Sequence, residues 1–367
     1  MWKFFRNISM KKTKHSLFIW SIVLMVGTLS CGTISDVLPS YNNTETTLPS
    51  MAPTLAEDVV EPIGDSQEER PVIVEPEAPS RIEVFSLTMP QFDNRDRNIQ
   101  VYLPPDYDTQ DRHYPVIYLL DGEYLFNPPT DTGGDYSIDE TLDRLFVEGY
   151  IEGMIAVGIE VDYDYRWDEY TPWVNHNMYD WVKEVNSEPI EGGEGFEFLA
   201  FIVETLKPEI DSRYRTLPDR ENTLIGGFCR TAIVPLVGGF TYPEVFSKVI
   251  AMSPTVWLAE NGGQWLSDNQ LINFIDEITV PENVRFFIHV GTEESSGNRP
   301  PIDDQNGKRI TYPQAYIEGA EALYGALIEN GVPTSNVQLE IIEGAAGGRD
   351  TWAERIDDAL VWLMKLN

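Results

Sequence analysis

A cysteine that follows two glycines is the first feature of this chain that could do chemistry. Cys229 is the middle residue of the segment 227–231 (GFCRT), and this segment directly follows a short apolar segment at 223–226. A thiol at a strand–helix junction would face the helix N-terminus, and Arg230 is adjacent; both favour the thiolate. Cys229 is therefore a candidate nucleophile for cleaving esters or thioesters, the alternative being a small residue that only fills space.

A thiol nucleophile normally needs a base, and histidines are scarce. Beyond residue 30 they are His113, His176 and His289. His113 precedes a predicted strand in a charged turn, where solvation is expected, and His289 lies inside the apolar segment 285–290, where a core position is expected. His176 lies in a loop and is the remaining candidate for the base.

The elements that must position these residues follow from hydrophobic periodicity. Residues 81–87 and 97–103 alternate apolar and polar side chains, which predicts an antiparallel pair at a sheet edge. Continuous apolar runs predict buried strands, and helical spacing predicts helices between them. We expect strands at 114–120, 154–159, 223–226, 248–252, 285–290 and 337–342, and helices at 138–147, 196–210, 312–329 and 352–366. This alternation predicts an α/β fold with a mostly parallel central sheet, an antiparallel leading pair and helices on both faces.

Several short motifs occur in order along the same region. In them the chain resembles the putative esterase family (esterase D and enterochelin esterase-like proteins), which includes enterochelin esterases, feruloyl esterases and mycolyltransferases. The resemblance extends from about Arg81 to the C-terminus and implies an α/β-hydrolase fold. The motifs are Asp121-Gly122, Arg166, Glu169-Tyr170-Thr171-Pro172, 206–216 (LKPEIDSRYRT), 242–246 (YPEVF), Met252-Ser253-Pro254, Trp257 and 290–293 (VGTE).

The resemblance implies a specific catalytic apparatus, which this chain lacks in part. The family places a serine nucleophile at a G-x-S-x-G turn and uses a histidine as its base. Here Cys229 replaces the serine, and Thr231 replaces the second glycine, where its branched side chain is expected to crowd the turn. The histidine position corresponds to Gly347, or to Gly348 if the loop is shifted. The usual base is therefore absent.

The remaining catalytic positions are also inferred from the resemblance. Glu293 fits the place of the acid, with Glu294 next to it, although without a histidine both fit ordinary loop charges. The oxyanion hole would consist of the backbone N–H groups of Arg230 and Glu123. The Glu123 side chain would bring a negative charge close to this hole, which argues against efficient acyl transfer.

The N-terminus predicts export. Lysines precede an apolar run at 17–29, and the following TLSC sequence resembles a bacterial lipobox ending at Cys31. We therefore predict a lipoprotein signal peptide at 1–30 and a lipid anchor on Cys31; an uncleaved N-terminal anchor is the alternative. Both place the domain in the cell envelope, on the extracytoplasmic face of the membrane. Translation starts at Met1 or Met10.

Composition defines the rest of the organisation. Residues 31–80 are rich in proline and acidic residues, which predicts a disordered linker before a domain at 81–367. The formal net charge of −34 excludes nucleic acid as a partner. Acidic stretches at 131–135 and 303–307 lack EF-hand spacing, so we predict no metal and no cofactor.

Two functional hypotheses remain. In the first, the domain is a pseudoenzyme that binds a small ester-like, aryl or sugar ligand in the former esterase cleft, lined by the aromatic-rich stretch 163–181. In the second, it is an active carboxylic-ester or thioester hydrolase, with Cys229 as nucleophile and His176 as base. Hydrogen-bond contact between these two side chains would favour the second hypothesis.

Overall fold

The computed structural model describes most of the region for which the sequence predicts a folded domain. The described residues are 75–126, 135–176, 192–259, 266, 268–294, 302–303 and 309–364. The predicted signal peptide, Cys31 and the linker up to residue 74 lie outside this part, so these predictions stay predictions. The acidic stretches at 131–135 and 303–307 also lie largely outside it.

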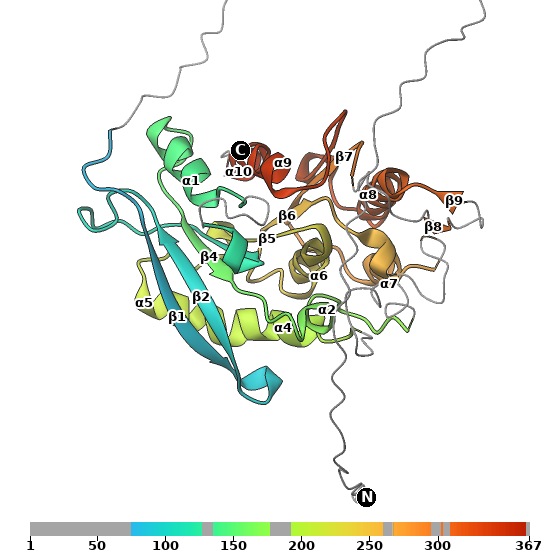
Figure 1. Cartoon of the computed structure of the whole chain (residues 1–367), viewed down its shortest axis with the longest axis horizontal. Helices are drawn as coiled ribbons and strands as arrows, with labels where there is room; N and C mark the ends of the chain where they lie inside the picture. Colours follow the sequence, from blue (N-terminus) through green and yellow to red (C-terminus); the bar gives the residue numbers. More distant parts are fainter. Residues whose placement is uncertain are drawn as a thin grey trace, which may run out of the picture. The chain divides into compact units, whose positions relative to one another are not determined.

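Within the described residues, an eight-stranded sheet has the order β1-β2-β4-β3-β5-β6-β7-β10 (Figure 1). β1 and β2 pair antiparallel, β2 pairs antiparallel with β4, and all further pairs are parallel. This confirms the predicted fold class. The strands are β1 (Arg81–Met89), β2 (Arg95–Leu103), β3 (Val116–Leu120), β4 (Ile155–Ile159), β5 (Thr223–Phe228), β6 (Lys248–Met252), β7 (Arg285–Gly291) and β10 (Val337–Ile342), with β8 (Ile302–Asp303) and β9 (Arg309–Ile310) as a separate pair.

Helices cover both faces of the sheet. α1, α9 and α10 pack on one face, and α4 to α8 pack on the other (Figure 1). The α-helices are α1 (Ile138–Val147), α2 (Arg166–Glu169), α4 (Gly195–Phe201), α5 (Lys207–Arg213), α6 (Ile233–Thr241), α7 (Gln270–Glu277), α8 (Tyr312–Glu329), α9 (Arg349–Ala353) and α10 (Ile356–Met364). The shorter turns are the 3₁₀ helices η1 (Pro90–Phe92), η2 (Gly122–Tyr124), η4 (Arg220–Asn222), η5 (Cys229–Ala232), η6 (Val256–Ala259) and η7 (Thr334–Asn336), and the π-helical η3 (Ile202–Leu206).

The burial of the strand side chains agrees with the sequence patterns. Side chains of β1 alternate between half-buried and exposed, as an edge strand with one solvated face requires. Those of β3, β4 and β5 are buried on both faces, which explains their uninterrupted apolar runs. The predicted helix at 312–329 coincides with α8.

Two helices differ in detail from the prediction. The segment at 196–210 continues to Arg213 through α4, η3 and α5, with a π-helical turn in its middle. The segment at 352–366 is divided into α9 and α10 by a turn, and Trp352 packs against the stacked rings of Tyr136 and Phe228. Among the described helices, none combines the length and the apolar character that a membrane crossing requires.

Candidate active site

The candidate site lies where the carboxyl ends of neighbouring parallel strands meet. Asp121 directly follows β3, α2 belongs to the loop after β4, and Cys229 directly follows β5. Since β4, β3 and β5 are adjacent in the sheet, these three segments converge at one edge. This edge is where open α/β sheets bind ligands.

Cys229 occupies a strained turn between β5 and α6. Its φ angle is 57°, a left-handed conformation that costs free energy for any residue with a side chain. Gly227 allows the chain to double back, because a Cβ atom there would stand 2.4 Å from the Thr231 carbonyl oxygen. The structure therefore contains the nucleophile elbow expected from the sequence. The catalytic role of Cys229 stays a prediction.

Thr231 does not crowd this elbow, and that expectation was wrong. Its side chain is fully buried, and its hydroxyl accepts a hydrogen bond from the Phe228 N–H at 2.8 Å. The same hydroxyl donates to the Phe228 carbonyl at 2.9 Å. The threonine thus closes the turn by bonding to its backbone, and the steric restriction falls on Gly227.

The sulfur of Cys229 contacts a tyrosine. Its Sγ lies 3.2 Å from the hydroxyl of Tyr316 on α8, and the Tyr316 ring packs edge-on against Trp257 at 4.3 Å. Neither aromatic residue was singled out as a neighbour of the thiol from the sequence, because Tyr316 is 87 residues away. His176 is exposed at the end of a described segment, and its role as a base stays a prediction.

The position expected for the missing histidine lies against a carboxylate. A Cβ atom on Gly347 would stand 1.8 Å from Oε2 of Glu294. The loop around Gly347 is fixed on the end of β7, since the Glu293 N–H donates to the Ala345 carbonyl at 2.8 Å and Gly344 N–H donates to the Thr292 hydroxyl. No side chain larger than hydrogen fits at residue 347 unless Glu294 moves.

Glu294, and not Glu293, is the buried carboxylate of this region. The Glu293 side chain is exposed, whereas Glu294 is 1% exposed. Glu294 Oε1 accepts hydrogen bonds from the Ser253 hydroxyl at 2.5 Å and the Gly291 N–H at 2.9 Å. Burial raises the pKa of Glu294, and these two hydrogen bonds oppose the rise. Glu293 is therefore not the buried carboxylate of this loop, and its role as the acid stays a prediction.

This carboxylate belongs to a polar chain that reaches the closing helices. The Trp352 indole N–H donates to the Ser253 hydroxyl at 2.8 Å, and this hydroxyl in turn bonds to Glu294. Ser253 itself has a φ of 50° and is fully buried. The Met252-Ser253-Pro254 motif thus holds Glu294 in place, and nothing in this chain resembles a carboxylate that orients an imidazole.

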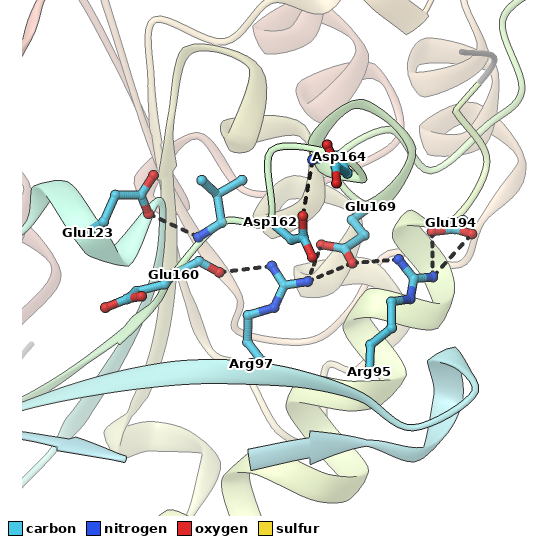
Figure 2. A network of polar contacts seen from close by, with 9 residues as sticks. Arg95, Arg97, Glu123, Glu160, Asp162, Asp164, Glu169 and Glu194 are labelled. Atoms are coloured by element: carbon cyan, nitrogen blue, oxygen red, sulfur yellow. Dashed lines mark hydrogen bonds and ion pairs between the residues drawn. The ribbon is translucent and has the colours of Figure 1, made fainter. Parts of the chain in front are cut away.

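Glu123 turns its side chain toward the β4–α2 loop. Its carboxylate accepts a hydrogen bond from the Val161 N–H at 2.9 Å (Figure 2). It also accepts one from the Tyr163 hydroxyl at 3.1 Å. Burial and the nearby Asp121 raise the pKa of Glu123. Arg230 is the second residue of η5, where backbone N–H groups have no acceptor within the helix. The oxyanion roles of these two N–H groups stay predictions.

Two arginines, Arg166 and Arg230, lie at the elbow. The guanidinium of Arg166 on α2 bonds to Asp121 at 2.6 Å. The neighbouring Trp167 ring stacks under the guanidinium of Arg230, whose central carbon lies 3.1 Å from the ring centroid. Nε and Nη1 of Arg230 are buried without a hydrogen-bond partner. Burial lowers the pKa of Arg230 to about 10, and the proximity of Arg166 contributes to this.

The other end of α2 is fixed by matched charges. Glu169 is fully buried and accepts hydrogen bonds from Arg97 at 2.7 and 2.9 Å and from Arg95 at 3.0 Å (Figure 2). Arg97 also donates to the Glu160 carbonyl, and Arg95 bonds to Glu194. Burial raises the pKa of Glu169 to about 7, although both arginines oppose this. This cluster anchors α2 to β2 and so positions Arg166 and Trp167.

The aromatic stretch at 163–181 lines the cleft only in part. Trp167 contacts Arg230, but Tyr170 is buried against Phe198, and Trp173 packs on Phe196 and Phe274. Tyr163 and Tyr165 are exposed, and Tyr179 and Trp181 lie outside the described residues. Several rings of this stretch therefore pack in the core, and the role of the others in lining a ligand cleft stays a prediction.

The other two histidines have the burial that the sequence predicts. His113 is exposed. His289 is fully buried on β7, as expected of a core position, but it is not a satisfied core imidazole, because neither ring nitrogen has a hydrogen-bond partner among the described residues. Burial lowers the pKa of His289 to about 4. In the part of the chain that the structure describes, no group of three or more metal-ligating side chains could hold an ion.

An elbow of this geometry, at the carboxyl end of a central strand in a mostly parallel sheet, defines an α/β-hydrolase. The sequence profile of the putative esterase family matches residues 91–321, and the chain belongs to this family. The uncharacterized protein YbbA of Bacillus subtilis (strain 168) is 23% identical over 271 residues, which cover 74% of this chain and 94% of that protein.

Solved structures share the fold at low sequence identity. A ferulic acid esterase is similar with a TM-score of 0.54 at 17% identity, covering 78% of this chain and 98% of the other. The BES protein from Bacillus cereus is similar with a TM-score of 0.55 at 18% identity, covering 78% and 96%. The enterobactin esterase FES from Shigella flexneri reaches 0.55 at 17% identity, covering 80% and 61%.

Proposed function

We propose that this chain is an exported, lipid-anchored pseudo-hydrolase, which binds a small ester-like or aryl ligand at the elbow and lacks serine–histidine turnover. The observation that carries this proposal is the position of Glu294. Its Oε2 fills the space beside Gly347 where the family's histidine side chain would begin. A base has to reach hydrogen-bond distance from the nucleophile, and at residue 347 it could do so only if Glu294 moved. At the alternative position, Gly348, a Cβ atom would meet nothing within 4 Å.

The hydrogen bonds that hold Glu294 in place support the loss of the histidine base. Glu294 is held by Ser253 and by the Gly291 N–H, and Ser253 is held by Trp352. The sulfur of Cys229 has the Tyr316 hydroxyl as its neighbour, and a phenol is a far weaker base than imidazole at neutral pH. Several coordinated changes would be needed to restore a histidine at this place.

The ligand class follows from the surroundings of Cys229 and from the relatives. Tyr316 and Trp257 are each 3% exposed and form a buried aromatic wall behind the thiol. The half-buried Trp167 supplies aromatic surface near the elbow, which suits flat aryl or acyl groups. One similar structure is a ferulic acid esterase, and FES was crystallised in the presence of 2,3-di-hydroxy-N-benzoyl-glycine. We infer an aryl or acyl ligand here by analogy with these proteins.

A turnover assay tests the proposal. The purified full-length chain would be assayed in detergent with short-chain p-nitrophenyl esters and with thioesters, beside Cys229→Ala and Cys229→Ser. We expect the wild type to hydrolyse no faster than Cys229→Ala. Turnover that Cys229→Ala abolishes would overturn the pseudo-hydrolase proposal.

A thiol hydrolase is the second candidate, and the elbow itself favours it. Cys229 keeps the strained φ of 57°, which is costly to retain if the residue merely fills space. In this case the base would be His176. His176→Ala would then remove the same activity that Cys229→Ala removes, whereas an unchanged rate would exclude His176.

Lipid anchoring is tested separately from catalysis. We expect Cys31→Ala to move the protein from the membrane fraction to the soluble fraction of a bacterial lysate and to abolish labelling with radioactive palmitate. Unchanged fractionation together with unchanged labelling would contradict the anchor on Cys31.

A further inference from the structure

The guanidinium of Arg230 lies at the elbow without a counter-charge. No hydrogen bond or ion pair engages it within the described part of the chain, and two of its nitrogens are buried without a partner. The chain carries 60 acidic residues against 26 basic ones, so a carboxylate partner would be easy to supply. An unpaired, half-buried cation costs folding free energy unless something outside the chain compensates it.

The nearest carboxylate is already engaged by another arginine. Asp121 bonds to Arg166 at 2.6 Å, and Arg166 repels Arg230 electrostatically. One carboxylate and two guanidinium groups therefore leave a local excess of one positive charge beside Cys229. Glu123 bonds to the Val161 N–H and the Tyr163 hydroxyl, and it is not among the main charges that act on Arg230.

The stacking on Trp167 determines which part of Arg230 a ligand can reach. The ring covers one face of the guanidinium at 3.1 Å, so hydrogen bonding is left to the N–H groups along the edge of the plane. Of these nitrogens, Nε and Nη1 are buried, whereas Nη2 is neither hydrogen-bonded nor among the buried nitrogens, so it contacts solvent. Nη2 is therefore the donor that a ligand can reach, and its charge-assisted hydrogen bond suits one oxygen of a carboxylate.

We propose that Arg230 recognises a carboxylate group on the aryl or acyl ligand of this elbow. The proposal rests on the proposed function, since it assumes that the elbow binds a ligand, and it adds the chemical class of that ligand. Cys229 and Arg230 are consecutive in η5, and Trp257 and Tyr316 lie beside the thiol. Both of these rings are only 3% exposed, so they form the wall behind the thiol. The ligand is therefore an organic anion whose apolar part lies beside Cys229 while its carboxylate bonds to Arg230.

A paired-ligand titration tests this recognition. The full-length chain in detergent would be titrated calorimetrically with cinnamate and with cinnamamide, which have the same shape but differ in charge. We expect cinnamate to bind roughly ten- to hundredfold more tightly, the range of a charge-assisted hydrogen-bonded pair. Arg230→Met should remove this preference, and Arg230→Lys should restore only part of it because the planar group that stacks on Trp167 is lost.

A matched control comes from another stacked arginine. Arg213 on α5 lies 4.1 Å over the Phe85 ring and pairs with Glu209, so Arg213→Met removes an equivalent cation away from the elbow. We expect it to leave the preference for cinnamate intact. Thermal unfolding of each variant distinguishes a lost site from a lost fold.

The outcomes separate this inference from the proposed function. Equal binding of cinnamate and cinnamamide by the wild type, or an unchanged preference in Arg230→Met, would overturn the carboxylate site and leave ligand binding intact. Binding of neither compound would overturn the carboxylate site and also count against a ligand-binding role for the elbow. Cys229-dependent ester hydrolysis would overturn the pseudo-hydrolase proposal, whereas the comparison of the two ligands would still decide the role of Arg230.

Discussion

Between β2 and α2 the buried charges are matched, whereas around the carboxyl ends of β5 and β7 they are not. Glu169 contacts two arginines at 2.7 and 3.0 Å. By contrast, among the described residues Arg230 has no anion, Glu294 has no cation, and the His289 ring nitrogens have no partner. Matched charges fix the position of an element, while unmatched ones carry a cost that a structural role does not explain. This contrast supports the proposal that the ligand site lies in the second region.

Removing the central carboxylate of the matched cluster should have the largest effect. Glu169→Ala leaves Arg97, which is 2% exposed, without a counter-charge. We expect a loss of about 3–5 kcal/mol in the free energy of unfolding, measured by urea denaturation. Glu194→Ala is the matched control, because Glu194 is 38% exposed and its pair with Arg95 should contribute less than about 1 kcal/mol. Similar losses in both variants would contradict the distinction between the buried ion pair of Glu169 and the exposed ion pair of Glu194.

The unmatched histidine should make the domain sensitive to acid. Burial lowers the pKa of His289 to about 4, so the unfolded chain binds a proton at this residue between pH 6.5 and 4 and the folded chain does not. The free energy of unfolding is therefore highest above pH 6.5 and falls by roughly 3 kcal/mol as the pH falls toward 4. The stability curve of His289→Leu should fall less over this range by about that amount. Parallel curves for the two proteins would refute the assignment.

Restoring a histidine should expose the steric conflict with Glu294. Gly347→His places a side chain on Glu294 Oε2, and we expect a loss of about 1–3 kcal/mol. Glu294→Ala removes the obstacle but leaves the Ser253 hydroxyl and Gly291 N–H without their acceptor, at a cost of about 1–3 kcal/mol. The double variant should therefore lose less than the sum of the two single losses. Strict additivity in urea unfolding would show that the two sites do not interfere.

Arg230→Met should have the smallest effect on stability. Because no carboxylate is left unpaired, the substitution removes an uncompensated cation and keeps apolar contact with Trp167. We expect the free energy of unfolding to stay within about 1 kcal/mol of the wild type or to rise. A loss comparable to that of Glu169→Ala would place Arg230 among the structural arginines and remove the contrast between the two regions.

Much of the fold could be predicted because it depends on local patterns. Apolar runs marked strands such as β6 and β7, and helical spacing marked α8 over its full length. The nucleophile position was predictable as well, since an elbow requires a glycine at Gly227 whatever the distant chain does. The division of the last helix was not predicted, because the apolar spacing of residues 352–366 continues through the turn between α9 and α10.

The site was less predictable than the fold for the same reason. The sequence alone determined that a cysteine replaces the serine and that no histidine follows His289, because both facts concern which residue stands at which position. Only the tertiary structure decided that Glu294 fills the space of the missing base, that Tyr316 contacts the thiol and that Arg230 is left unpaired. Each of these depends on side chains far apart in sequence meeting at one edge of the sheet, where distance and burial, and not residue type, determine which groups become partners.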